Sequence, residues 1–81
     1  MRVLLFAGLA DLAGAAQVDL EPATDADGVV HVSALRAAFE EQVPAAAQTS
    51  YQVAVDHAYA SDSDPVQEGQ ELAFIPPVSG G

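Results

Sequence analysis

The chain has 81 residues, 51% of them hydrophobic, and carries 12 acidic side chains against two arginines, with no lysine and no cysteine. This length lies at the low end of single-domain size, so it excludes a two-domain enzyme and allows one modest core. The net charge of -10 argues against nucleic acid or a membrane as partner and favours a basic protein surface. Without cysteine, neither disulfides nor thiolate metal sites supplement the core.

The first residues permit two interpretations. Met1-Arg2, the apolar run after them and the small residues 13–15 mimic a secretory signal with its cleavage site. Asp11 interrupts that run, and residues 3–6 also fit a buried strand with apolar side chains on both faces. No stretch approaches the roughly 18 to 20 apolar residues that span a bilayer. We therefore expect a soluble, cytoplasmic protein.

Short elements alternate with turns in the next part of the chain. Residues 9–14 predict a short turn or helical cap, and residues 16–21 alternate apolar and polar side chains as in a half-buried strand. Residues 22–28 are rich in turn formers and have no apolar period. This last segment is therefore expected to be an exposed loop.

One amphipathic helix is predicted after that loop. Its apolar side chains recur at spacings of three and four, at Val32, Leu35, Phe39 and Val43. Pro44 ends the helix, because a residue before proline is disfavoured in helical geometry. Glu40 and Glu41 lie at the negative end of the helix dipole, so we expect the last turn to fray.

The C-terminal half predicts further extended segments. Residues 45–50 are a featureless connection, residues 51–56 alternate as a strand, and a brief extended piece surrounds Tyr59. Turn-forming residues follow at 61–65 and 68–70, and residues 72–75 predict the last strand, which Pro76-Pro77 ends because proline donates no ladder hydrogen bond. The expected fold is α+β, with a helix on one face of a small mixed sheet. If the first and last strands are neighbours, they are parallel at its centre.

Few side chains offer catalytic or metal-binding chemistry. His31 and His57 lack the partner spacing typical of a zinc site. The acidic turns at 25–28 and 62–64 lack the spacer and the final glutamate of a calcium loop, so solvated turn acids are the favoured interpretation. We therefore predict no metal and no bound cofactor.

The last residues are different in kind. Gly80-Gly81 ends the sequence with two residues that have no side chain, which suits a channel too narrow for any side chain. A frayed terminus is the alternative. The six residues after Ile75 span about 20 Å, enough to reach a partner's active site. We therefore divide the chain into a domain over residues 1–75 and a flexible tail over residues 76–81. A carboxylate is unreactive toward nucleophiles, but conversion to an acyl-adenylate would create a leaving group, after which sulfur can be installed to give a thiocarboxylate.

Four segments carry a resemblance to a known family. Three are weak alone, at residues 3–7 with 11–14, at 32–36 and at 53–56. The fourth, residues 68–81, is specific because it ends in Ala-Phe-Ile-Pro-Pro-Val-Ser-Gly-Gly. With these segments the chain resembles the small, sulfur-carrier subunit of molybdopterin synthase. The resemblance implies the β-grasp fold that this family shares with ubiquitin. Many relatives have Arg at the position of Ala10 and Asn at that of Asp56, which puts partner pairing in question.

The resemblance also implies a function. An E1-like adenylyltransferase would adenylate Gly81 with ATP, a sulfurtransferase would supply sulfur indirectly, and the tail with Gly80 would enter the large subunit of a heterotetramer. There the thiocarboxylate would give sulfur to the cyclic pyranopterin precursor in molybdenum cofactor biosynthesis. The small subunit would be a sulfur donor without catalysis of its own.

The implied partner interface leads up to the diglycine and comprises Phe74, Ile75, Pro76, Pro77, Val78 and Ser79. Because Phe74 and Ile75 alternate, one belongs to the core and the other faces a partner.

Three alternatives stay open. The chain fits a sulfur carrier for thiamine biosynthesis or tRNA thiolation, which shares the diglycine and differs in the residues before it. It also fits a ubiquitin-like modifier that is attached to protein lysines. The third alternative is an acidic interaction domain whose last residues are incidental.

Overall fold

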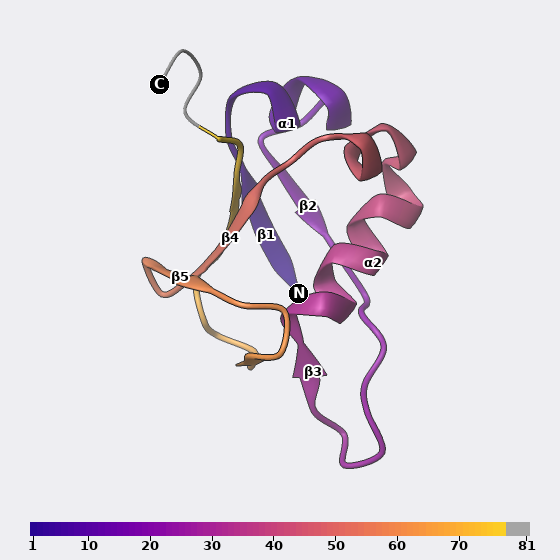
Figure 1. Cartoon of the computed structure of the whole chain (residues 1–81), viewed down its shortest axis with the longest axis vertical. Helices are drawn as coiled ribbons and strands as arrows, with labels where there is room; N and C mark the ends of the chain where they lie inside the picture. Colours follow the sequence, from indigo (N-terminus) through magenta and orange to yellow (C-terminus); the bar gives the residue numbers. More distant parts are fainter. Residues whose placement is uncertain (78–81) are drawn as a thin grey trace.

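The computed structural model describes residues 1–77, and their fold is built on a mixed five-stranded sheet (Figure 1). In chain order the elements are β1 (Arg2–Leu5), α1 (Ala7–Ala13), β2 (Gln17–Asp19), β3 (Val30–His31), α2 (Val32–Gln42), a 3₁₀ helix (Pro44–Gln48), β4 (Gln52–Val55), β5 (Ala58–Ala60), β6 (Pro65–Val66) and β7 (Leu72–Ile75). The predicted helix, the exposed loop over 22–28 and the last strand are confirmed. Neither α-helix in this part of the chain is long and apolar enough to cross a bilayer.

The sheet has the strand order β2-β1-β7-β4-β5, so the first and last strands lie side by side. They pair in parallel, with Val3 opposite Leu72 and Leu5 opposite Phe74, while the other neighbours in this sheet are antiparallel. Strands β3 and β6 form a separate two-stranded sheet. A helix held against a mixed sheet with parallel first and last strands is the β-grasp fold. The fold class and the parallel pairing are therefore confirmed.

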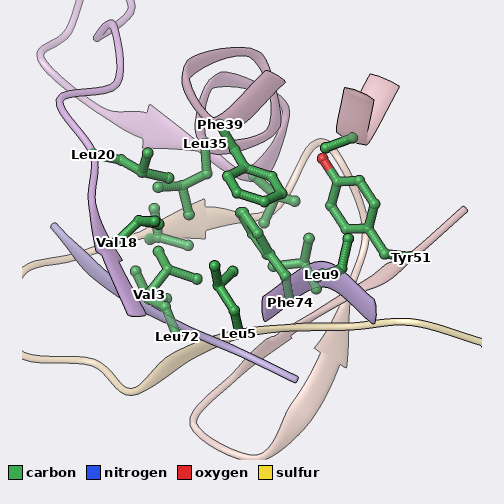
Figure 2. Packing of buried hydrophobic residues seen from close by; sticks show 14 of the residues in the cluster. Val3, Leu5, Leu9, Val18, Leu20, Leu35, Phe39, Tyr51, Leu72 and Phe74 are labelled. Atoms are coloured by element: carbon green, nitrogen blue, oxygen red, sulfur yellow. The ribbon is translucent and has the colours of Figure 1, made fainter. Parts of the chain in front are cut away.

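Three aromatic rings form the centre of the core between α2 and the sheet (Figure 2). The ring centroids of Phe39 in α2 and Phe74 in β7 are 4.9 Å apart, and that of Tyr51 lies 5.1 Å from Phe74 and 5.9 Å from Phe39. Aromatic pairs in this range contribute about 0.5–1.5 kcal/mol beyond the area that they bury. The cluster therefore joins the helix to the central strand.

Two connections are more regular than the sequence predicts. The turn expected at 9–14 is the helix α1, which ends at Gly14, where φ is 72° and the backbone N–H donates to the carbonyl of Ala10 at 2.9 Å. Glycine adopts this left-handed geometry without steric cost. The connection expected to be featureless contains a 3₁₀ helix that begins at Pro44 and buries Ala46 completely. Small residues allow this helix to approach the core closely.

The end of α2 has a polar partner that the sequence does not reveal. The Tyr51 hydroxyl donates a hydrogen bond of 2.7 Å to the Glu40 carboxylate. The Arg36 guanidinium lies 4.6 Å from the centroid of the Tyr51 ring and bonds Asp62 at 2.7 Å. The carboxylate that the helix dipole disfavours is thus held by tertiary contacts. The fraying of the last turn stays a prediction.

Substitution Tyr51→Phe tests this contact. Removing the hydroxyl leaves a half-buried carboxylate without its donor, so the free energy of unfolding at neutral pH should fall by about 1 kcal/mol. Burial, and then the Glu40 carboxylate, raise the pKa of Tyr51 in the folded chain. Its stabilising contribution is therefore present below the unfolded pKa of about 10 and is lost as the pH rises above it. Urea unfolding at several pH values should show a smaller alkaline loss for Tyr51→Phe, and an equal loss would contradict the assignment.

The uneven charge makes stability depend on salt. Both arginines already pair with carboxylates, Arg2 with Asp19 at 3.6 Å and Arg36 with Asp62 at 2.7 Å, while the net charge stays at -10. Self-repulsion among the remaining carboxylates destabilises the compact state, and salt screens it. The midpoint of thermal unfolding should therefore rise when KCl is raised from about 0.1 M to about 1 M. Over this range the Debye length falls from about 10 to about 3 Å.

A matched variant separates charge screening from general salt effects. Asp11, Glu21 and Glu41 are exposed, and neutralising all three as Asp11→Asn, Glu21→Gln and Glu41→Gln should reduce the rise with KCl. The same rise in the variant would show that repulsion is not its cause.

Candidate functional site

The outer face of the sheet, which points away from α2, carries an apolar groove. The strand register places Leu4, Ala73, Ala54 and Tyr59 in one row across β1, β7, β4 and β5. Side chains alternate along a strand, so these four point away from the core that their neighbours build. The two alanines in the middle form a low floor, and the larger Leu4 and Tyr59 stand at its sides. We call this feature the outer-face groove.

One end of the outer-face groove lies where the chain leaves the sheet. Phe6, which is 47% exposed, and Ile75, which is half-buried, line this end. Because β1 and β7 are parallel, both strands finish at the same edge. Directly after Phe6, Ala7 has a φ of 48°, a left-handed conformation that turns the backbone into α1. Pro76 and Pro77 follow Ile75 at this edge.

The other end of the groove is polar. His57 Nε2 lies 3.0 Å from the Glu71 carboxylate, and both side chains line the groove. The neighbouring Asp56 carboxylate accepts hydrogen bonds from the backbone N–H of Glu71 at 2.9 Å and from the side chain of Gln70 at 3.1 Å. These two donors, the backbone N–H first, hold the pKa of Asp56 below its usual value. Asp56 therefore keeps its charge while its oxygens are occupied.

A tight turn positions this polar end. Asp56 and His57 connect β4 to β5 and have φ values of 50° and 72°. Two consecutive positive φ angles are typical of a type I′ hairpin turn, which favours Asn-Gly or Asp-Gly. Asp56 fits its position, whereas His57 occupies one where glycine is preferred. The histidine is thus held in a strained conformation at the rim of the groove.

The size of the groove and its chemistry fit protein side chains better than a cofactor. Its volume of about 240 Å³ lies below the roughly 300–1,000 Å³ of typical small-molecule sites. Within residues 1–77, no buried side-chain nitrogen or oxygen lacks a hydrogen-bond partner, and no three His, Asp or Glu side chains gather to hold a metal ion. The mixture of exposed aromatic, aliphatic and carboxylate groups is that of a protein-docking surface.

The two histidines are separate. His31 Nδ1 lies 3.7 Å from the carboxylate of Asp25, and His57 contacts Glu71 instead. Asp25 also accepts the backbone N–H groups of Asp27 and Val29 at 2.8 and 3.0 Å. These bonds, the one from Val29 first, lower the pKa of Asp25. The loop carboxylate therefore orders its own turn.

The predicted interface residues divide into three groups. Phe74 is fully buried beneath α2, so it is the core member of the Phe74–Ile75 pair. The partner interface itself stays a prediction. Ile75 is the outward-facing member of the pair and lies in the groove, followed by the half-buried Pro76 and the exposed Pro77. The remaining predicted site residues, Val78, Ser79, Gly80 and Gly81, lie outside the described residues.

The sequence interpretation missed most of the groove. It predicted a first strand buried on both faces, but only Val3 and Leu5 face the core, while Leu4 is half-buried and Phe6 exposed. The available signal in the sequence was that residues 3–6 are apolar at every position, whereas a single predicted helix can cover only one face of the sheet. The sequence does not indicate that Ala54 and Ala73 form the floor, because only the register of β4 with β7 places them opposite each other. Ala10, by contrast, packs against the core from α1.

Comparisons with known proteins agree with this fold. The model of the ThiS family matches residues 3–81. A crystal structure of small archaeal modifier protein 1 from Haloferax volcanii has 28% identity and a TM-score of 0.74, and the match covers 100% of this chain and 98% of that one. A second structure of that protein has 27% identity and a TM-score of 0.80 over 96% and 97% of the two chains. A putative molybdopterin converting factor, subunit 1, from Pyrococcus furiosus has 21% identity and a TM-score of 0.80 over 95% of each chain.

Substitution His57→Gly tests the strain in the turn. Glycine adopts a positive φ without steric cost, and the exposed ion pair with Glu71 that is lost contributes little. The free energy of unfolding should therefore rise by about 0.5–1 kcal/mol in urea titrations. Ala58→Gly in the adjacent strand, where φ is not positive, is the matched control and should lower stability. Equal destabilisation by both changes would argue against strain at His57.

Proposed function

Because the chain belongs to the ThiS family of ubiquitin-like sulfur carriers and modifiers, we propose that it is the sulfur-carrier subunit of molybdopterin synthase. The observation that carries this proposal is the family match through Gly81, together with the ending Pro-Pro-Val-Ser-Gly-Gly. The structural likeness to the Pyrococcus furiosus protein supports the fold alone. The proposed place of action is the cytoplasm, in a heterotetramer with the large subunit.

The proposed chemistry takes place on the carboxylate of Gly81. An oxygen of this carboxylate attacks the α-phosphorus of ATP in an E1-like adenylyltransferase, so that pyrophosphate leaves and an acyl-adenylate forms. The persulfide of a sulfurtransferase then displaces AMP to form an acyl disulfide, and a thiol cleaves its S–S bond to leave the thiocarboxylate and a disulfide. In the large subunit this sulfur passes to the cyclic pyranopterin precursor. Such a carrier requires a reactive terminus and a docking surface but no catalytic side chain of its own.

The position of the outer-face groove supports a carrier in which the groove docks the partner and the chain end reacts. The groove lies on the strand that continues toward Gly81, and Ile75 belongs to both the groove and the exit of the chain. A partner that docks on the groove is therefore placed beside the residues that it has to receive. The charge of -10 favours basic docking surfaces on the activating enzyme and the large subunit, and disfavours nucleic acid and membranes.

A second function has a specific observation in its favour. The two structures with 27–28% identity are of a protein named as a modifier. In that case the acyl-adenylate would lead to an amide bond with a lysine of another protein instead of ending as a thiocarboxylate. A carrier for thiamine biosynthesis or tRNA thiolation would share the thiocarboxylate and differ in the acceptor.

Mass spectrometry tests the leading proposal. The full chain is incubated with ATP, the E1-like enzyme of the same organism and a sulfur source. We expect the mass increase that accompanies replacement of one carboxylate oxygen by sulfur, located on the C-terminal peptide. A chain without Gly81 is the control and should gain none, because the next residue is not presented at the same reach. An unchanged mass of the full chain would refute sulfur carriage.

Two further readouts separate the acceptors. Restoration of molybdenum-enzyme activity in a strain that lacks its own small subunit supports the synthase, whereas restored thiamine synthesis or tRNA thiolation supports the related carriers. Isopeptide-linked conjugates that require Gly81 support the modifier.

A further inference from the structure

The outer-face groove combines an apolar floor with an acidic end. Ala54 and Ala73 expose little more than methyl groups along its middle, and the Glu71 carboxylate lies at the end remote from Ile75. A purely aliphatic side chain would fill the floor but leave the carboxylate without a partner. A side chain with a long apolar stem and a cationic head satisfies both parts, since such residues bury the stem and keep the charge at the rim.

Glu71 is the carboxylate of this end that is open to a partner. Both oxygens of Asp56 accept hydrogen bonds from within the chain. Within residues 1–77 the Glu71 carboxylate contacts His57 Nε2 at 3.0 Å, and this imidazole is a full countercharge only when protonated. Arg2, on the adjacent strand β1, pairs with Asp19 at 3.6 Å. The half-exposed Glu71 thus faces outward in a chain with a net charge of -10.

An aromatic wall completes the groove. Tyr59 is the most exposed large hydrophobic side chain of the described residues, at 69%, and stands in the row of Ala54. An exposed tyrosine ring offers its face to a cation, an interaction of about 0.5–1 kcal/mol at such sites. A carboxylate and an aromatic face in one groove are the two groups on which a planar guanidinium docks well.

We propose that the outer-face groove takes an arginine side chain of the partner protein. The stem of this arginine covers Ala54 and Ala73, its guanidinium pairs with Glu71, and Tyr59 forms the wall along which it lies. The inference rests on the proposed function, because a carrier has to dock on its activating enzyme and its synthase. Arginine fits better than lysine, since its flat, weakly hydrated head stacks on a ring and bonds both carboxylate oxygens at once.

A titration with small probes tests the pocket without any partner enzyme. The ¹⁵N-labelled full chain is titrated with N-acetyl-Leu-Arg-amide and with the matched citrulline peptide, which has nearly the same shape and no charge. Amide shifts are expected at Ala54, Tyr59, Glu71 and Ala73 for the arginine probe. The citrulline probe should bind about tenfold more weakly, as befits the loss of one charge-assisted hydrogen bond. Equal binding of both probes, or arginine shifts spread over acidic residues elsewhere, would overturn the proposal.

Two variants and a control locate the effect. Glu71→Gln should weaken the arginine probe about tenfold and leave the citrulline probe unchanged. Ala73→Leu should abolish binding of both probes, because the added side chain fills the floor. Ala37→Leu makes the same change on the exposed side of α2 and should alter neither. If Glu71→Gln binds the arginine probe as tightly as the unchanged chain does, the guanidinium is not recognised there.

The sulfur-loading assay keeps the two proposals apart. Loading of the unchanged chain without binding of the arginine probe would overturn the groove assignment alone. Binding of the probe without loading would overturn sulfur carriage alone. When both succeed, Glu71→Gln should raise the KM of the activating enzyme for the carrier more than it lowers kcat, because the residue acts in docking and precedes Gly81 by ten positions in the sequence.

Discussion

The parallel pairing of β1 with β7 is the constraint on which the rest of the structure depends. It brings the first and last strands of the domain together, places Phe74 beneath α2 in contact with Phe39, and brings Phe6 and Ile75 to one edge. Parallel strands cannot be joined by a tight turn, so the intervening chain has to supply a long crossover. Here that crossover provides α2, which covers the inner face, while no other helix within residues 1–77 covers the outer face (Figure 1).

The same strands therefore serve stability on one face and the proposed partner recognition on the other. Along β7, Leu72 and Phe74 are buried in the core, while Ala73 and Ile75 line the outer-face groove. This alternation separates the two tasks, since a change of an outward side chain need not disturb the aromatic cluster. The acidic surface adds a third property: the proposed attraction to basic partners and the self-repulsion of the folded chain come from the same carboxylates, and salt weakens both.

Local patterns were sufficient for much of the fold. The helix over Val32–Gln42 follows from apolar spacing, and the end of β7 follows from Pro76-Pro77. What the sequence could not provide was register and the covering of faces, both of which are long-range properties. Two alanines become a floor only because Ala54 lies opposite Ala73, and Phe74 rather than Ile75 is buried only because α2 lies on that side. The tight Asp56–His57 turn was hidden for another reason, since histidine replaces the glycine that normally marks it.

The burial of Phe74 has a consequence for distance. Because this ring packs against Phe39 of α2 and Tyr51, and β7 is hydrogen-bonded to β1 and β4, the point at which the chain leaves the sheet is fixed. Each residue added or removed after Ile75 changes the maximum reach by about 3.3–3.6 Å, which exceeds the tolerance of a reacting centre. For the proposed carrier, the number of residues after the sheet therefore matters as well as their identity.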